Sequence, residues 1–251
     1  MSGFIRLISA QTKNLAKKAK QSVICYNALM LFRIYHAPDP VLTLTGEDFK
    51  YLAGVLRLQA GDLFETASEQ KIGIYKIGKI GKNSLTAILQ NEYIENNEPE
   101  KKMHLVLPLL KSDKLDYVLQ KATELGVYKF WLYESERSPV KFGKGENKTE
   151  RWRKIIVSSV CQSRRNHLPE IEKIALNELS GKFSAVYYAH PAAEKHLSDF
   201  PDNAALVIGP ESGFSPAELN YLAVNGQAFS LGGRILRAET AAVAIAARAL
   251  L

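Results

Sequence analysis

The sequence predicts an α/β protein in which a mostly parallel sheet follows a smaller, β-rich unit. From Lys102 onward, short apolar runs alternate with segments of helical spacing, which is typical of parallel strands joined by helices. Residues 30 to about 90 contain short β-type runs broken by glycine. Residues 91–102 are polar and contain Pro99, so we expect a linker there. We therefore expect a basic extension over 1–29 and two domains, over 30–98 and 99–251.

The β-rich unit has few but distinct signals. The segments 32–38 and 71–90 are rich in β-type residues, and we expect strands in both. The intervening segment 46–65 predicts a short helix and then a strand, with a turn at Gly61–Asp62.

The second domain has a regular rhythm. Strands are expected over 103–110, 127–134, 183–190, 205–210 and 227–232. Helices are expected over 114–126, 149–162, 216–226 and 235–251. Ser215 and Glu218 have the spacing of a capping box, and Pro216 takes the first helical position.

Composition narrows the class of protein. The chain has 251 residues, of which 46% are hydrophobic, so it can bury a sizeable core. No apolar run approaches the roughly 18 residues that a membrane span needs. Cys25 and Cys161 are the only cysteines, and they lie far apart without metal-ligand spacing. We therefore expect no membrane association, no disulfide framework, no metal and a reducing compartment, the cytoplasm.

The net charge of +7 is unevenly distributed. Residues 1–29 contain five basic residues and no acid, and the remaining chain is nearly balanced, with 28 basic against 26 acidic residues. The extension could be a transit peptide or follow from a start codon placed upstream of a natural start at Met30, and its single arginine favours a disordered or non-native segment. Between Arg137 and His167, nine lysines and arginines face two glutamates. This stretch suits a polyanionic partner, although a solvated helix face explains the charge equally well.

Three predicted strand ends stand out as candidate ligand sites: 187–191, 207–215 and 230–236. Ligands of open α/β sheets bind beyond the carboxyl ends of the strands, where glycine lets the backbone approach them. Turns alone also need glycine, but two glycine-rich ends that carry charged residues favour a binding site. The dinucleotide and P-loop fingerprints are absent from the sequence.

A serine hydrolase is also disfavoured. Ser212 lies one place too late for a G-x-S-x-G elbow, and a histidine partner would have to be His167, His190 or His196.

The two glycine-rich segments carry a family resemblance. "VIGPESGFSPAEL" (207–219) and "LGGRILRAETAAVAIAARALL" (231–251) resemble the C-terminal motifs of SPOUT-class RNA methyltransferases, and more closely those of the 16S rRNA uridine-N3 methyltransferase family, RsmE. The order of five further motifs agrees: "VLRLQAGD" (55–62), "KATELGV" (121–127), "ERSPVK" (136–141), "ERW" (150–152) and "QSRRNHLPEI" (162–171).

The resemblance implies a PUA-like β-barrel followed by an α/β domain with a trefoil knot. It also implies S-adenosyl-L-methionine as cofactor, a homodimer with its active site near the interface, and 16S rRNA or the assembled small ribosomal subunit as partner. The cofactor-binding residues would be Ile208, Gly209, Pro210, Glu211, Ser212, Gly213, Leu231, Gly232, Gly233, Ile235 and Leu236. Contacts to rRNA would come from Arg57, Arg137, Lys141, Arg151, Arg153 and Arg164.

The implied reaction needs an unpaired uridine whose N3 loses its proton. Negative charge then spreads to the neighbouring carbonyl oxygens, which a guanidinium would stabilise. Arg165 and Arg237 are the catalytic candidates, although Arg237 could instead clamp a phosphate or a carboxylate. Glu211 is the candidate general base, or else a ligand for the donor's amino group or ribose.

Several positions depart from the usual pattern of the family. Ser212 and Arg164 stand where glycine is usual, Gly233 replaces proline and Ala238 replaces threonine, and Lys50 and Tyr51 stand at two positions that are often histidine. Two other functions stay open: a SPOUT methyltransferase acting on tRNA or another rRNA site, and an RNA-binding protein without catalysis.

Overall fold

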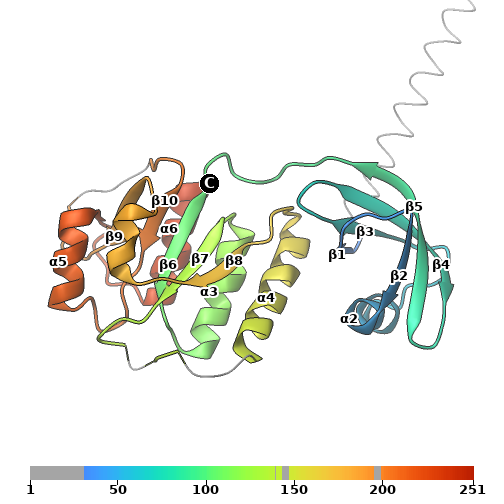
Figure 1. The fold of residues 1–251 in the computed structure, drawn as a ribbon, viewed down its shortest axis with the longest axis horizontal. Helices are drawn as coiled ribbons and strands as arrows, with labels where there is room; N and C mark the ends of the chain where they lie inside the picture. Colours follow the sequence, from blue (N-terminus) through green and yellow to red (C-terminus); the bar gives the residue numbers. More distant parts are fainter. Residues whose placement is uncertain (1–30, 139, 143–146, 195–198) are drawn as a thin grey trace, which may run out of the picture. The chain divides into compact units, whose positions relative to one another are not determined.

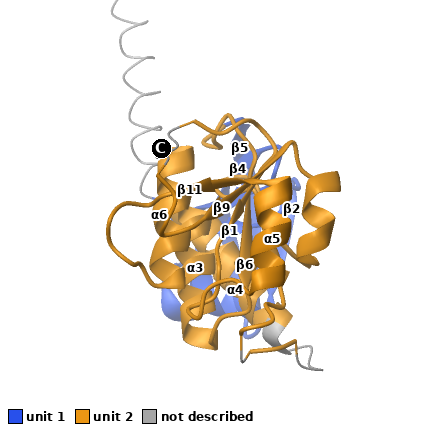
Figure 2. Cartoon of the chain, turned by 90° about the vertical axis from the view of Figure 1, so that its left-hand side faces the viewer, with its two compact units in different colours: residues 1–95 blue, residues 96–251 orange. Residues whose placement is uncertain are grey.

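The computed structural model describes residues 31–138, 140–142, 147–194 and 199–251. They form two compact units that divide between Glu95 and Asn96 (Figure 2). We call them unit 1, up to residue 95, and unit 2, from residue 96, and each is described by itself. The predicted extension over 1–29 with Cys25, as well as Lys144 and His196, lies outside the described residues.

Unit 1 is a curled, mixed sheet of five strands. These are β1 (Arg33–Tyr35), β2 (Val41–Thr45), β3 (Leu63–Ala67), β4 (Ile72–Ile80) and β5 (Ser84–Tyr93), in the order β1-β3-β4-β5-β2. Only the β1–β3 pair is parallel. Two register shifts between β4 and β5 bend the sheet, as β-bulges do. The predicted helix becomes α2 (Gly46–Phe49) and a π-helical turn (Lys50–Val55), which seals the core with the buried Leu52.

The predicted linker over 91–102 is wrong at its start. Strand β5 runs on to Tyr93, because β4 offers a ladder partner as far as Ile72, which pairs with Tyr93. Asn91 and Glu92 are both exposed, so polar residues are compatible with a strand here. At the other end of the segment, Glu98 enters an ion pair within unit 2. Polarity alone therefore did not distinguish a linker from a half-exposed strand.

Unit 2 is built on a six-stranded sheet in which every pairing is parallel (Figure 1). The strands are β6 (Met103–Pro108), β7 (Lys129–Tyr133), β8 (Glu170–Lys173), β9 (Ala185–Ala189), β10 (Ala204–Val207) and β11 (Gln227–Phe229), in the order β11-β9-β10-β6-β7-β8. Strands β6 and β10 are buried along their whole length, as expected for central strands covered on both faces. The predicted mostly parallel sheet is confirmed; β2 and β8 were not predicted.

Helices cover both faces of this sheet. On one face α3 (Ser112–Glu124) packs between α4 (Asn147–Ser163) and α6 (Ala238–Leu250). On the other, α5 (Pro216–Asn225) packs with a 3₁₀ turn (Leu176–Gly181), β9 and β11 (Figure 2). The predicted capping box of α5 is confirmed, because Ser215 Oγ accepts from the Glu218 N–H at 3.1 Å and the Ser215 N–H donates to Glu218 Oε2 at 2.7 Å.

The last crossing of the chain creates the candidate site. Strand β11 lies at the edge of the sheet, yet the following helix α6 packs on the central strand β6 and on α3. Residues 230–237 must therefore pass over the carboxyl ends of the strands between β11 and β6. Within the described residues, no helix combines the length and apolar character of a membrane span.

Candidate functional site

A pocket of about 440 Å³ opens at the carboxyl ends of β9, β10 and β11. All three strand ends singled out from the sequence contribute to its walls. Its volume suits a small organic ligand or cofactor. Nine of the eleven predicted cofactor residues line it: Ile208, Gly209, Pro210, Glu211, Gly213, Leu231, Gly232, Ile235 and Leu236.

Backbone requirements explain the glycines of the pocket. Gly213 and Gly232 adopt φ of +73° and +109°, a region that L-residues rarely occupy. A Cβ at Gly209 would lie 3.1 Å from the ring of Phe214, so this glycine lets the ring pack closely. A Cβ at Gly232 or Gly233 would meet no atom within 4 Å. The 231–236 segment therefore exposes bare backbone, which can approach a ligand.

The pocket floor is fixed by buried groups behind it. The hydroxyl of Tyr133, at the end of β7, donates to the carbonyl of Ile208 at 2.9 Å. Burial raises the pKa of Tyr133 well above its usual range, and the charge of Glu218 raises it further, so the hydroxyl stays a donor. The buried Glu218 carboxylate also accepts from the Ser135 hydroxyl at 3.2 Å and the Glu136 N–H at 2.9 Å. These bonds join the segment after β7 to the segment after β10.

Lys114 of α3 links the two halves of the pocket. Its ammonium forms an ion pair with Glu211, on the first glycine-rich segment. It also lies 3.7 Å from a carboxylate oxygen of Glu239, which follows the second segment in the first turn of α6. Glu211 is half exposed and lines the pocket, so the Lys114 ion pair orients its carboxylate there.

Several other lining residues were not among the predicted site residues. His190 and Arg234 are the charged or titratable ones, and the ring of Phe214 packs beneath Gly209. Nδ1 of His190 accepts from the N–H of Ala192 at 3.3 Å. The strand end at 187–191 was the available signal for His190. Ile235 borders the pocket but is 89% exposed.

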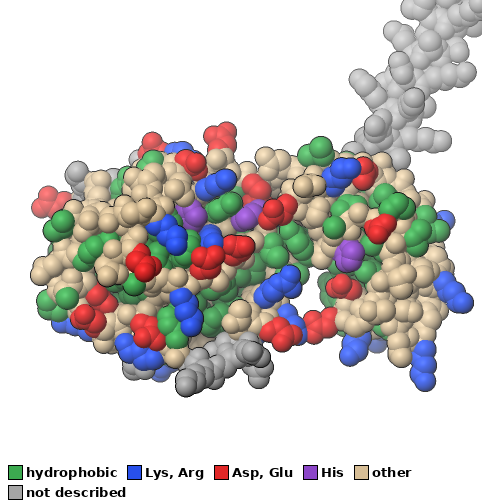
Figure 3. All heavy atoms as spheres, viewed as in Figure 1, with side chains coloured by type: hydrophobic (Ala, Val, Ile, Leu, Met, Phe, Trp, Pro, Cys, Tyr) green, Lys and Arg blue, Asp and Glu red, His purple; other side chains and the backbone are tan. Residues whose placement is uncertain are grey.

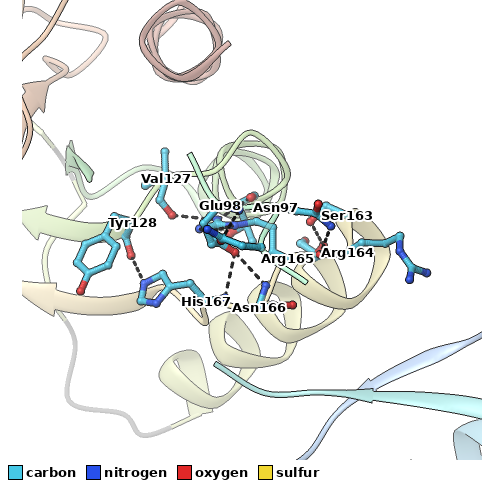
Figure 4. Close-up of polar contacts among 12 residues, drawn as sticks. Asn97, Glu98, Val127, Tyr128, Ser163, Arg164, Arg165, Asn166 and His167 are labelled. Atoms are coloured by element: carbon cyan, nitrogen blue, oxygen red, sulfur yellow. Dashed lines mark hydrogen bonds and ion pairs between the residues drawn. The ribbon is translucent and has the colours of Figure 1, made fainter. Parts of the chain in front are cut away.

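Arg165, a predicted catalytic residue, is not among the residues that line the pocket. Figure 4 shows its polar contacts. Its guanidinium donates to the Glu98 carboxylate, at 2.9 and 2.5 Å, and to the carbonyls of Thr123 and Val127, at 2.8 and 3.0 Å. The residue is 2% exposed. The guanidinium is committed to buried acceptors here, which favours a structural role over the predicted catalytic one.

Glu98 completes this buried anchor. Its second carboxylate oxygen accepts from the N–H groups of Asn166 and His167 at 2.9 and 3.0 Å (Figure 4). Burial alone would raise the pKa of Glu98, but the Arg165 guanidinium and these N–H groups hold it below its ordinary value. We call Glu98, Arg165 and the groups they bind the Arg165 anchor.

Arg237, the other predicted catalytic arginine, is exposed and occupies the N-cap position of α6 without a capping hydrogen bond from its side chain. Its side chain makes no hydrogen bond with any residue that the structure describes, and it lies just outside the pocket lining. Ser212 and Gly233 also lie outside the lining.

The predicted RNA contacts differ in exposure and pairing. Arg137 lines the pocket, Lys141 donates to the carbonyl of Ser135 at 2.8 Å, and Arg151 pairs with Asp116. Arg57 of unit 1 and Arg153 of α4 are exposed, whereas Arg164, where α4 ends, is half-buried. Figure 3 shows lysines and arginines interspersed with acids over the visible face of unit 2.

Comparisons with known proteins place this site in a family. Residues 96–250 match the RNA methyltransferase domain family, which defines the class of the protein. Ribosomal RNA small subunit methyltransferase E of Bacillus subtilis is 30% identical, over 80% of this chain and 86% of that protein. The Synechocystis protein of the same name is 32% identical, over 85% of this chain and 75% of its own. The chain therefore belongs to the ribosomal RNA small subunit methyltransferase E family, as the sequence motifs predicted.

Solved structures agree with this assignment. A methyltransferase from Legionella pneumophila in complex with the cofactor SAM is 30% identical, with a TM-score of 0.80 over 86% of this chain and 95% of that one. Ribosomal RNA small subunit methyltransferase E from Neisseria gonorrhoeae bound to S-adenosyl methionine is 26% identical, with a TM-score of 0.77 over the same shares. The predicted fold class is confirmed: an N-terminal barrel-like sheet and an α/β domain of the SPOUT knot class.

Proposed function

We propose that the protein transfers a methyl group from S-adenosylmethionine to N3 of a uridine in 16S rRNA. The observation that carries the proposal is the pocket formed by two glycine-rich segments at the strand ends. Family membership supports the rRNA substrate, and the SAM-bound relatives support the cofactor. We further propose, from the family resemblance, that the enzyme acts as a cytoplasmic homodimer on 16S rRNA or the assembled small subunit.

The residues present fit the cofactor. The side chains of Ile208, Leu231 and Leu236 give the pocket apolar walls, and the open backbone at Gly232 offers polar groups. This combination suits a flat adenine ring whose edges need hydrogen bonds. Among the described residues, no cluster of three or more His, Cys, Asp or Glu could hold a metal ion. When bound, the cofactor supplies an activated methyl group.

The chain's own residues then have to position the target uridine and accept the proton from its N3. Tyr133 keeps the Ile208 carbonyl fixed, and Lys114 holds Glu211 at the pocket wall. We propose that Glu211 accepts the N3 proton, since its carboxylate lines the pocket and is half exposed. Arg237, exposed beside the pocket, is proposed to hold a phosphate next to the target uridine.

The test uses the purified full-length protein with tritiated S-adenosylmethionine. The acceptors are 16S rRNA and small subunits prepared from a strain lacking the modification, and the methylated nucleotide is mapped by mass spectrometry. Label at N3 of one uridine is the expected result. Label at another position, or in tRNA, would refute the specificity, and RNA binding without cofactor binding would refute methyl transfer altogether.

A further inference from the structure

We propose that Arg137 is the guanidinium that contacts the target uracil and stabilises the charge that develops on it. This inference rests on the proposed function. Of the two arginines expected to do this, Arg165 is buried in its anchor and Arg237 lies outside the pocket lining. Among the described residues, the arginines that line the pocket are Arg137 and Arg234.

The backbone around Arg137 is held on both sides. Before it, Ser135 and the N–H of Glu136 bind the buried Glu218. After it, the hydroxyl of Ser138 donates to the carbonyl of Leu109 at 3.1 Å. The carbonyl of Arg137 itself accepts from the hydroxyl of Ser212 at 3.0 Å. A donor on so constrained a backbone costs little reorganisation when charge develops nearby.

The guanidinium of Arg137 remains available. Nη1 makes one long hydrogen bond, 3.4 Å, to the carbonyl of Ser212, and no carboxylate among the described residues pairs with the group. Most of its five N–H donors are therefore open to a ligand. Arg234 also lines the pocket and is exposed, but it follows Gly232 and Gly233, whose backbone is less constrained. Of the two pocket arginines, Arg137 is the better preorganised.

Uridine N3 needs this kind of group. The N3 proton passes to Glu211, and the charge left on the ring is shared by the O2 and O4 oxygens. An N–C bond then forms at N3 as the donor's C–S bond breaks, and the electron pair of that bond stays on sulfur. Hydrogen bonds from Arg137 to O2 or O4 favour the ionised ring and so lower the effective pKa of N3. Arg137 would therefore accelerate the step without binding the cofactor.

The experiment compares Arg137→Ala and Arg137→Lys with the wild type and with Arg248→Ala, an exposed arginine near the end of α6. Methyl transfer is measured across pH on target RNA that carries either uridine or 5-fluorouridine, whose N3 is more acidic. We expect Arg137→Ala to lower kcat about 100-fold, to shift the rising limb of the pH profile upward, and to be partly rescued by 5-fluorouridine. Arg137→Lys should retain an intermediate rate, and the affinity for S-adenosylmethionine, measured by calorimetry, should not change.

Other outcomes would overturn the inference. A raised KM with unchanged kcat and pH profile would make Arg137 a phosphate contact, and lost cofactor affinity would make it a cofactor ligand. If the wild type itself fails to bind the cofactor or to label N3, the proposed function fails instead.

Ser212 provides a finer test of the same idea. Ser212→Gly and Ser212→Ala both remove the hydroxyl that holds the Arg137 carbonyl, and only Ala keeps a Cβ. We expect both to lower kcat about fivefold in the wild type and to have little effect in Arg137→Ala. Equal effects in both backgrounds would show that Ser212 does not act through Arg137.

Discussion

The pocket and the Arg165 anchor each contain an arginine from a family motif, Arg137 and Arg165, but the two arginines have opposite surroundings. At the anchor, Glu98 and two backbone carbonyls satisfy the guanidinium beneath the surface. In the pocket lining, Arg137 has a fixed backbone but no carboxylate partner among the described residues. A paired, buried charge stabilises the fold, whereas an unpaired, exposed charge is available to a ligand. Burial and pairing, more than membership of a motif, separate the two roles.

The largest expected effect comes from breaking the anchor. Arg165→Ala leaves the Glu98 carboxylate and two carbonyls without their donor, so we expect a loss of about 3–5 kcal/mol in the free energy of unfolding. Arg165→Lys keeps the positive charge but loses the fork of N–H donors. Its free energy of unfolding should therefore lie between those of the wild type and Arg165→Ala. Urea unfolding measures the change, with Arg153→Ala on the exposed face of α4 as control, expected within about 0.5 kcal/mol. A stable Arg165→Ala protein that binds the cofactor but cannot turn over would restore the catalytic role.

Acid should weaken the same anchor. The pKa of Glu98 is lowered in the folded protein, so its contribution is complete above the pKa of the unfolded carboxyl. That contribution is lost as pH falls through the folded-state pKa. Stability measured by urea unfolding from pH 7 to pH 3 should therefore fall more steeply in the wild type than in Glu98→Gln, which cannot ionise. Parallel curves for the two proteins would assign the acid sensitivity to other carboxylates.

The sequence predicted the pocket better than it predicted the arginines. Glycine-rich ends of apolar runs are local signals, and parallel strands bring their carboxyl ends to one edge, so Ile208–Gly213 and Leu231–Leu236 could be placed together. The capping box at Ser215 and Glu218 was equally local.

The partners of Arg165 are Glu98, 67 residues away, and carbonyls on either side of the α3 end. No spacing rule links such distant groups. For the same reason the sequence could not show that, within the basic stretch over 137–167, Arg165 is buried, Arg151 pairs with Asp116 and Arg137 stays exposed.

A smaller effect, on RNA binding rather than on stability, should come from Arg237, an exposed arginine beside the pocket. Its side chain is exposed and unpaired within the described part of the chain, so Arg237→Ala should leave stability unchanged within about 0.5 kcal/mol. We expect about tenfold weaker binding of RNA and a salt dependence that is shallower by about one phosphate contact. Filter binding at several salt concentrations measures both, beside calorimetry of the cofactor. Lost turnover with RNA affinity intact would instead return Arg237 to the catalytic group.

The smallest effect on stability should come from Arg164, which directly precedes Arg165 and has an unusual backbone conformation. Its φ of +60° lies in the left-handed region, and its carbonyl accepts from the Asn97 side chain at 3.1 Å. An L-residue there is strained by about 1–2 kcal/mol, and glycine is not. Because Arg164→Gly and Arg164→Ala both remove the side chain, their difference isolates the backbone. We expect the glycine variant to be more stable by about 1 kcal/mol in urea unfolding.

Arg153→Gly and Arg153→Ala, in the middle of α4, serve as the matched control. They should show the opposite order, with the alanine variant more stable than the glycine variant by about 1 kcal/mol. Equal stabilities, or the same order at both positions, would mean that the turn into Arg165 relaxes when its side chain is removed. The anchor would then tolerate a different approach of the chain. The reversal of order would instead show that the left-handed backbone before Arg165 persists when the Arg164 side chain is removed.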